Sequence, residues 1–458
     1  MDQDRCDETW LKEASVDQHQ FDEFARRLAQ PLTRRGGLRG IAAAIAGLTV
    51  GIPAADAARK ASRRHEKLAC RNLHSQCTSD DQCCTNNCAP VPPYEGTGFR
   101  CARGHHRRKG DGKKNGGGGV DPCDQTCTVC PTCAFTTITA AVMNAQSGST
   151  IFIAPGIYEE EIVLVGDGPS VLTFDRCGCT GEVIWRGVPA GSQSSGPQPQ
   201  GPGYYPCTLG VIGERDVTIR NISMVGSPSA GFANAQILVA NDPINNLSTF
   251  RADAVVFRDM LTADSYGVAP LLISGRVSAS VENCTFQNNT RYYTGGVEFM
   301  GTRDGSALAI TNSLFTENSG RAHAGAIHVE GASLTVSDTT ITANECYEEF
   351  GGGAVTLYPG TSATFTDSTI SANVGTGVGG GFYVVADVDE VGASIDLTLA
   401  GATTVTGNTA GSVAGGLAVD GTFATVTGAT TRVSGNNPDQ CAERTDGVNW
   451  TIVAGCAY

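Results

Sequence analysis

Lysine is missing from about the last three quarters of the sequence, because no lysine follows Lys114. Residues 120–458 hold 12 arginines and 32 Asp+Glu, a net charge of −20, whereas the whole chain of 458 residues carries −14. An acidic surface of this kind repels phosphate backbones, which excludes nucleic acid as a partner. It would also repel a polyuronate unless Ca²⁺ bridged the two, and no other cofactor is expected.

Long apolar runs are scarce as well. The run from Gly40 to Ile52 has 13 residues, too few for a comfortable transmembrane helix. It follows Arg34-Arg35 and precedes the small residues Ala54 to Ala58, a pattern that resembles a twin-arginine export signal. Gly37 stands where that family has a large apolar residue, so an ordinary secretion signal or a retained anchor are the alternatives. Residues 1–57 are thus expected to direct export to the cell surface or beyond, with no other membrane segment.

Aromatic residues (7%) and charged residues (17%) are few, and the 3.6-residue periodicity of helical repeats is absent. A repeat of another kind fills the C-terminal two-thirds. A large apolar residue is followed three positions later by Asn, and a small-residue pair with Gly then opens an apolar run. Six copies place Asn at 289, 318, 344, 373, 408 and 436, with spacings of 26 to 35 residues. A period in this range predicts a solenoid.

The residue types of the copies predict strands. Segments such as Leu334-Thr335-Val336-Ser337 alternate apolar and polar residues and are bounded by Gly, Asn, Ser and Asp. Stacked coils would lie about 4.8 Å apart, which lets the six Asn side chains hydrogen-bond as a ladder in a turn, where Asn tolerates left-handed backbone. The Gly pairs would form corners that a Cβ would block.

These repeats resemble the right-handed parallel β-helix of the pectin-lyase-like superfamily, and also the repeats of chlamydial polymorphic outer-membrane proteins. The entry segment fits, because a short amphipathic helix at Phe135–Val142 precedes the strand segment Thr150–Tyr158. The resemblance covers about residues 123–458. It implies an all-β fold whose first coil is capped by the helix, and it says little about activity, because this fold hosts lyases, hydrolases, adhesins and spacers.

Six cysteines at positions 70–101 include an adjacent pair, with the spacing Cys-x6-Cys-x5-Cys-Cys-x3-Cys-x12-Cys. The spacing alone allows fifteen connectivities. It resembles an inhibitor cystine knot, and that resemblance implies the pairs Cys70–Cys84, Cys77–Cys88 and Cys83–Cys101. Either way, so small a module needs disulfides to fold and an oxidising compartment to form them. Residues 102–122, rich in Gly and basic residues, are expected to be a flexible linker.

The remaining cysteines are expected to stabilise the ends of the β-helix. Cys441 and Cys456 are predicted to pair across the C-terminal end, and Cys284, in phase with Phe286, is predicted to be a free core thiol. When the six cysteines of the module, Cys6 and Cys284 are set aside, ten cysteines remain. This even number suits complete pairing. Metal ligation by the first four of the N-terminal group is the alternative. The N-terminal group expected in disulfides is Cys123, Cys127, Cys130, Cys133, Cys177, Cys179 and Cys207.

No catalytic motif of the fold's enzymes is legible. His328 alternates with Ile327 and is expected to face outward from a strand. The segments between each Asn and the next Gly pair occupy equivalent places in successive coils. Their aromatic, Arg and carboxylate side chains could form one strip for a sugar, with Glu348 and Glu349 as candidate acid/base residues. Expected glycan contacts are Arg291, Tyr292, Tyr293, Arg321, His323 and Tyr347, and a Ca²⁺ site is an alternative role for Asp387, Asp389 and Glu390.

The sequence therefore predicts an exported protein in four segments: a signal region (1–57), a cystine-knot-like module (70–101), a linker (102–122) and a β-helix (123–458). The favoured function is binding of a polysaccharide or another cell-envelope component. The alternatives are a polysaccharide lyase or glycoside hydrolase, and a structural or adhesive spacer.

Overall fold

A computed structural model of the chain describes three short N-terminal strands and most of residues 126–458. Not described are 167, 179, 188–206, 227–234, 242–245, 262–266, 303–304, 349–350, 386–393, 423, 430–431, 445–450, 453–455 and 457–458. The chain divides into two compact units, one spanning 38–119 and the other holding the rest. In the first, β1 (Gln76–Cys77), β3 (Phe99–Cys101) and β2 (Cys88–Pro90) form an antiparallel sheet in that order. The export signal, the linker, the disulfides of the cystine-knot-like module, Cys123 and Cys179 lie outside the described residues.

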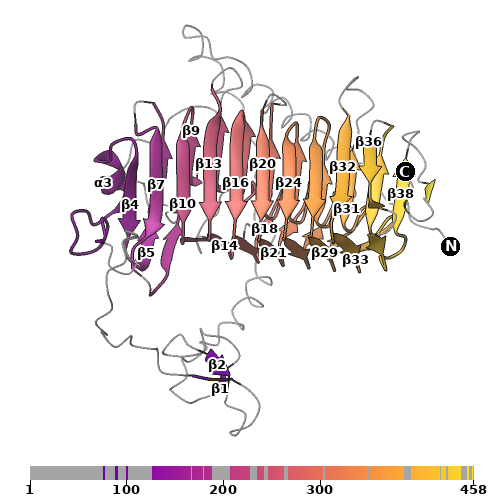
Figure 1. Ribbon diagram of the computed structural model, residues 1–458, viewed down its shortest axis with the longest axis horizontal. Helices are drawn as coiled ribbons and strands as arrows, with labels where there is room; N and C mark the ends of the chain where they lie inside the picture. Colours follow the sequence, from indigo (N-terminus) through magenta and orange to yellow (C-terminus); the bar gives the residue numbers. More distant parts are fainter. Residues whose placement is uncertain are drawn as a thin grey trace, which may run out of the picture. The chain divides into compact units, whose positions relative to one another are not determined.

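The second unit is a stack of coils, each contributing one strand to each of three long parallel sheets (Figure 1). Sheet 1 contains β4 (Ser149–Ile153), β7 (Val171–Arg176), β10 (Asp216–Arg220), β13 (Ser248–Asp253), β16 (Val277–Glu282), β20 (Ala307–Thr311), β24 (Ser333–Ser337), β28 (Ser362–Thr366), β32 (Ile395–Ala400) and β36 (Ala424–Thr427). Sheet 2 contains β5 (Gly156–Glu159), β8 (Val183–Arg186), β11 (Ser223–Val225), β14 (Val256–Arg258), β17 (Thr285–Gln287), β21 (Leu314–Thr316), β25 (Thr340–Thr342), β29 (Thr369–Ser371), β33 (Thr404–Thr406) and β37 (Val433–Ser434).

Sheet 3 is the third long sheet, and five of the coils also contribute to a short sheet. Sheet 3 contains β6 (Ile162–Leu164), β9 (Cys207–Ile212), β12 (Ala235–Asn241), β15 (Leu271–Gly275), β19 (Val297–Met300), β23 (Ile327–Glu330), β27 (Val355–Leu357), β31 (Phe382–Val385), β35 (Leu417–Asp420), β38 (Cys441–Arg444) and β39 (Thr451–Ile452). The short sheet contains β18 (Thr290–Arg291), β22 (Ser319–Gly320), β26 (Glu345–Cys346), β30 (Val374–Gly375) and β34 (Thr409–Ala410). Among these described strands, only β39 runs antiparallel to its neighbour, β38.

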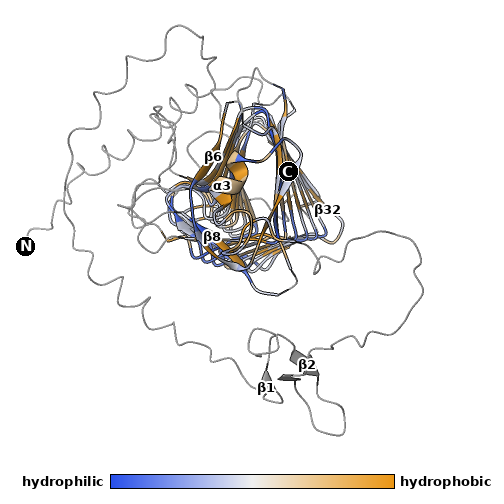
Figure 2. Ribbon diagram, turned by 90° about the vertical axis from the view of Figure 1, so that its left-hand side faces the viewer, coloured by the Kyte–Doolittle hydropathy of each residue, from blue (hydrophilic) through white to orange (hydrophobic). Residues whose placement is uncertain are grey.

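Seen along the stack, the sheets enclose an apolar interior, and the helix α3 (Ile138–Met143) lies over its first coil (Figure 2). Ile138, Ala141 and Val142 of this helix are buried in the same core cluster as the strands. The carboxylate of Glu160 accepts hydrogen bonds from the backbone N–H groups of Ile138 (2.8 Å) and Thr139 (2.7 Å), which satisfies the helix N-terminus. The predicted capping helix is confirmed.

The predicted asparagine ladder is also confirmed. The side-chain N–H of each Asn donates to the side-chain Oδ1 of the Asn in the next coil. The distance is 2.8 Å from Asn289 to Asn318 and 2.9 Å from Asn318 to Asn344. The chain of bonds continues through Asn373 and Asn408 to Asn436. The left-handed backbone, however, belongs to the residue before each ladder Asn, such as Asn288 with φ 54°. The Gly pairs make close corners as expected, since a Cβ on Gly325 would lie 2.0 Å from the Gly353 carbonyl oxygen.

Aromatic rings fill part of the core as stacks. The rings of Phe257, Phe286 and Phe315 lie 4.4 and 4.5 Å apart and nearly parallel. Phe286 and Phe315 each stand three residues before a ladder Asn, and Met260 takes that place after Phe257. Registered aliphatic residues, beginning with Ile341, continue the row. At this position successive coils therefore pack ring on ring.

Three disulfides join described cysteines. Cys127–Cys177 and Cys130–Cys133 hold the N-terminal end, and Cys441–Cys456 closes the C-terminal end as predicted. The predicted free core thiol at Cys284 is confirmed. The prediction was wrong for Cys207, which is a free buried thiol packed in an apolar cluster on the outer side of sheet 3. The complete pairing that the even number of cysteines suggested is not found either, because Cys346 is also a free buried thiol.

Candidate functional site

The predicted sugar strip lies where the chain passes from the short sheet to sheet 3, over three successive coils. Parallel register places Arg291 beside Gly320 and Gly320 beside Cys346, so the residues that follow these strands stack on one another. The structure divides the strip into an exposed half and a buried half. We use the name exposed strip for Tyr292, Arg321, Tyr347 and Glu348.

Contacts between coils organise the exposed strip. The Arg321 guanidinium carbon lies 5.2 Å from the centre of the Tyr292 ring, within the range of a cation–π contact. Arg321 Nε lies 3.3 Å from Glu348 Oε1, and the two side chains are 58% and 43% exposed. Tyr347 is 51% exposed, and the pKa of its hydroxyl is raised by partial burial and by a hydrogen bond with Glu345. Contacts of Arg321 therefore join side chains from three successive coils, and Tyr347 adds an exposed aromatic ring beside Glu348 in the sequence.

Tyr293, His323 and Arg291 were predicted to be exposed glycan contacts, and this prediction was wrong. Tyr293 packs in an apolar cluster with Cys207, Leu238 and Leu272. Arg291 is 5% exposed, and loss of hydration lowers the pKa of its guanidinium to about 10. These side chains turn inward because the segment between the short sheet and sheet 3 folds back over the outer face of sheet 3.

That fold-back also buries His328, which was predicted to face outward from its strand. His328 does point away from the core, as its alternation with Ile327 and Val329 requires, but it is only 1% exposed. It is registered with Glu298 on β19 and with Thr356 on β27, both fully buried. The row they form on the outer face of sheet 3 is a second, covered layer.

Glu298, His323 and His328, here called the buried triad, bring their ligand atoms within 4.8 Å of one another. His323 Nδ1 lies 3.5 Å from Glu298 Oε1, and the centres of the two imidazole rings are 4.4 Å apart. Burial and the neighbouring His323 lower the pKa of His328 well below its ordinary value. The sequence interpretation missed Glu298, whose signal was an acidic residue at a position where the neighbouring coils hold Leu, His, Thr, Tyr or Ala.

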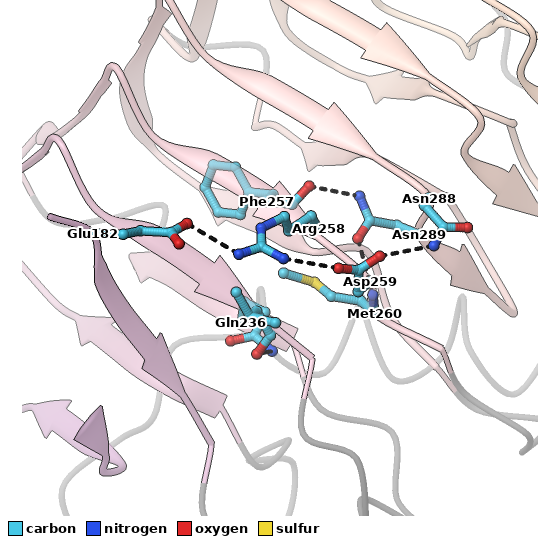
Figure 3. Close-up of polar contacts among 9 residues, drawn as sticks. Glu182, Gln236, Phe257, Arg258, Asp259, Met260, Asn288 and Asn289 are labelled. Atoms are coloured by element: carbon cyan, nitrogen blue, oxygen red, sulfur yellow. Dashed lines mark hydrogen bonds and ion pairs between the residues drawn. The ribbon is translucent and has the colours of Figure 1, made fainter. Parts of the chain in front are cut away.

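The structure describes only part of the other predicted acidic sites. Glu349, Asp387, Asp389 and Glu390 lie outside the described residues, so neither the predicted Glu348–Glu349 pair nor the Ca²⁺ loop has a described geometry. Elsewhere on the acidic surface, arginines neutralise carboxylates. Figure 3 shows Arg258 donating to Glu182 (3.0 Å) and Asp259 (3.1 Å), with Asp259 also accepting from Asn288.

In the described part of the chain, no helix is long and apolar enough to cross a membrane. Residues 210–437 match the family model for a right-handed β-helix region. Neither the curated proteins nor the solved structures offer a significant match. The family match and the stacked parallel sheets agree, and together they show that the part of the chain described from residue 126 onward folds as a right-handed parallel β-helix.

Proposed function

We propose that this β-helix protein is exported and binds a polysaccharide of the cell envelope or its surroundings through the exposed strip. The observation that carries the proposal is the group of Tyr292, Arg321, Tyr347 and Glu348 on three adjacent coils. Three coils at about 4.8 Å spacing present roughly 10 Å of surface, about the length of two sugar rings. Tyrosine faces can stack on the apolar sides of these rings, and Arg and Glu can hydrogen-bond to hydroxyls.

The rigidity of the site supports this function. The backbone of each strip residue is hydrogen-bonded to the neighbouring coil, for example Glu348 N–H to the Arg321 carbonyl oxygen at 2.8 Å. A surface already ordered loses little conformational entropy when a ligand binds. Export is supported by the three disulfides of the described residues, since disulfides persist in oxidising compartments.

Retention of the full-length protein on a panel of polysaccharides, with and without Ca²⁺, tests the proposal. For a retained glycan, Tyr347→Ala and Arg321→Ala should each weaken binding by about 2- to 10-fold, the range of one stacking or ion-pair contact. Arg251→Ala is the matched control, because Arg251 is exposed on β13 of sheet 1. All three variants should melt with the wild type, since exposed side chains add little stability.

The same experiment separates the other functions. Equal retention of the wild type and both strip variants would contradict the proposed site. New reducing ends or unsaturated products would identify a hydrolase or lyase, and Glu348→Gln would then test that carboxylate. Absence of both retention and turnover over the whole panel would leave the spacer function.

A further inference from the structure

Two members of the buried triad, Glu298 and His328, lie in a buried row of otherwise uncharged side chains. On the outer face of sheet 3, register aligns Leu238 with Leu272, Leu272 with Glu298, and Glu298 with His328. After Thr356 the row returns to Tyr383, Ala418 and Ala442. All of these side chains are buried. A carboxylate and an imidazole thus occupy adjacent places in a buried row whose other members carry no charge.

This placement is costly as it stands. Glu298 is 0% exposed, and neither of its carboxylate oxygens has a hydrogen bond. His328 Nδ1 also has none. Buried polar groups in proteins are normally paired, and buried charges are normally paired or bound to metal ions. The asparagine ladder of the same coils follows that rule, because every side-chain amide in it is hydrogen-bonded. The carboxylate oxygens of Glu298 and Nδ1 of His328 are exceptions to it.

We propose that Glu298, His323 and His328 bind one divalent transition-metal ion, for which Zn²⁺ is the natural probe. Two imidazoles and one carboxylate are the donor set of catalytic zinc sites and of related iron sites, whereas Ca²⁺ requires six or more oxygen donors. Donors about 2.0–2.1 Å from a tetrahedral ion lie about 3.3 Å apart. The His323–Glu298 separation of 3.5 Å already approaches that value, and all three donors lie within 4.8 Å of one another, so binding would draw them closer together.

The surroundings hold the ligands in place. Thr356 Oγ donates to the His323 carbonyl oxygen at 2.6 Å, and His323 N–H donates to the Tyr293 carbonyl oxygen at 3.0 Å. These bonds tie the loop that carries His323 to the coils on both sides. The Tyr358 ring meets His328 edge-on, with 4.8 Å between ring centres. Such outer contacts orient metal ligands and exclude competing water.

Three protein donors leave at least one coordination position for water or an exchangeable ligand. Of the three side chains, that of His323 is the most accessible at 9%, against 0% for Glu298, so its side gives the shortest route from solvent. The site is independent of the exposed strip, because none of its three ligands belongs to that strip.

Titration of metal-stripped full-length protein with Zn²⁺, followed by calorimetry, tests the proposal. The absorption spectrum of added Co²⁺ reports the donor set independently. We expect one ion per chain at this site, a tetrahedral-type Co²⁺ spectrum and a higher melting temperature with Zn²⁺. Glu298→Gln and His323→Ala should each weaken this binding at least 10-fold and abolish the melting shift.

The chain offers a matched control, because His105 and His106 of the linker segment could also bind zinc. The double variant His105→Ala/His106→Ala should keep the Co²⁺ spectrum and the melting shift. If Glu298→Gln is poorly folded, His323→Ala gives the answer, because its ring lies nearest the surface. Retention of full affinity in His323→Ala, or its loss in the His105/His106 variant alone, would overturn the proposal. So would a wild-type chain that shows neither spectrum nor shift.

Discussion

The asparagine ladder makes a quantitative prediction for Asn344, which is fully buried at its centre. Its amide donates to the Phe315 carbonyl oxygen (3.0 Å) and to Asn373 Oδ1 (2.9 Å). Its oxygen accepts from the backbone N–H (3.0 Å) and the side chain (2.9 Å) of Asn318. Asn344→Ala removes all of these and leaves the Asn318 N–H buried without that acceptor. An orphaned buried donor costs about 1–3 kcal/mol and each lost hydrogen bond about 1 kcal/mol, so we expect a loss of about 3–5 kcal/mol.

Urea unfolding followed by circular dichroism measures this loss. Thr335→Ala, exposed on β24 of the same coil, gives the background of a strand substitution, expected below about 1 kcal/mol. Asn436→Ala, at the end of the ladder and 6% exposed, should fall between the two. Because coils interact mainly with their neighbours, the Asn344 variant should also unfold less cooperatively, with a lower denaturant dependence. An effect of Asn344→Ala no larger than that of Thr335→Ala would refute the reasoning.

Three further predictions concern the core and its cysteines. Phe286→Ala should lower stability by about 3–5 kcal/mol in the same assay, because its ring stacks on both sides, and a loss below 1 kcal/mol would contradict this. Removing the Cys441–Cys456 disulfide by Cys441→Ala/Cys456→Ala should cost about 3 kcal/mol for a loop of this length, measured by melting beside the wild type; an unchanged transition would count against it. Burial raises the pKa of three thiols from 9.0 to about 12, so the folded protein should leave them unlabelled by a thiol reagent at pH 8, as peptide mapping would show. Since the folded state holds these protons more tightly, stability should also fall as the pH rises from about 9 to about 12; the thiols are Cys207, Cys284 and Cys346.

The sequence carried most of the fold because the coils repeat. Identical residues at equal spacing, such as Asn318 and Asn344, can satisfy one another only if coils stack in register, so the repeat predicts the geometry. The Gly pairs and the capping helix follow from the same local chemistry. The free thiol at Cys284 was predictable for a related reason, since it lies in phase with a core residue. It shares its turn position with Ser313, whose hydroxyl accepts from the Cys284 N–H at 3.1 Å.

The candidate site was less predictable because the alternation of residues along a strand indicates which way a side chain points, but not whether it is exposed to solvent. His328 points away from the core, as predicted, yet a segment from the same coil covers it. That covering depends on the path of the chain between the short sheet and sheet 3, which has no periodic signal. One signal was present: the middle residue after the Gly pair is Ala418 or Tyr383 in other coils, whereas outward positions of sheet 1 are mostly Thr, Ser or charged residues. An outward position that avoids charge in most coils indicates a covered surface.

The reversal of direction at β39 limits how the β-helix can grow. The outermost strand of a parallel sheet exposes unpaired N–H and C=O groups along its free edge, and an identical strand from another molecule could pair with them and extend the stack. Because β39 runs antiparallel to β38, it occupies the edge of sheet 3 with a strand that the next coil cannot continue. The disulfide Cys441–Cys456 ties the end of the chain beside it. β39 therefore hinders pairing of this edge of sheet 3 with an identical strand of another molecule. The regular repeats would otherwise favour such polymerisation.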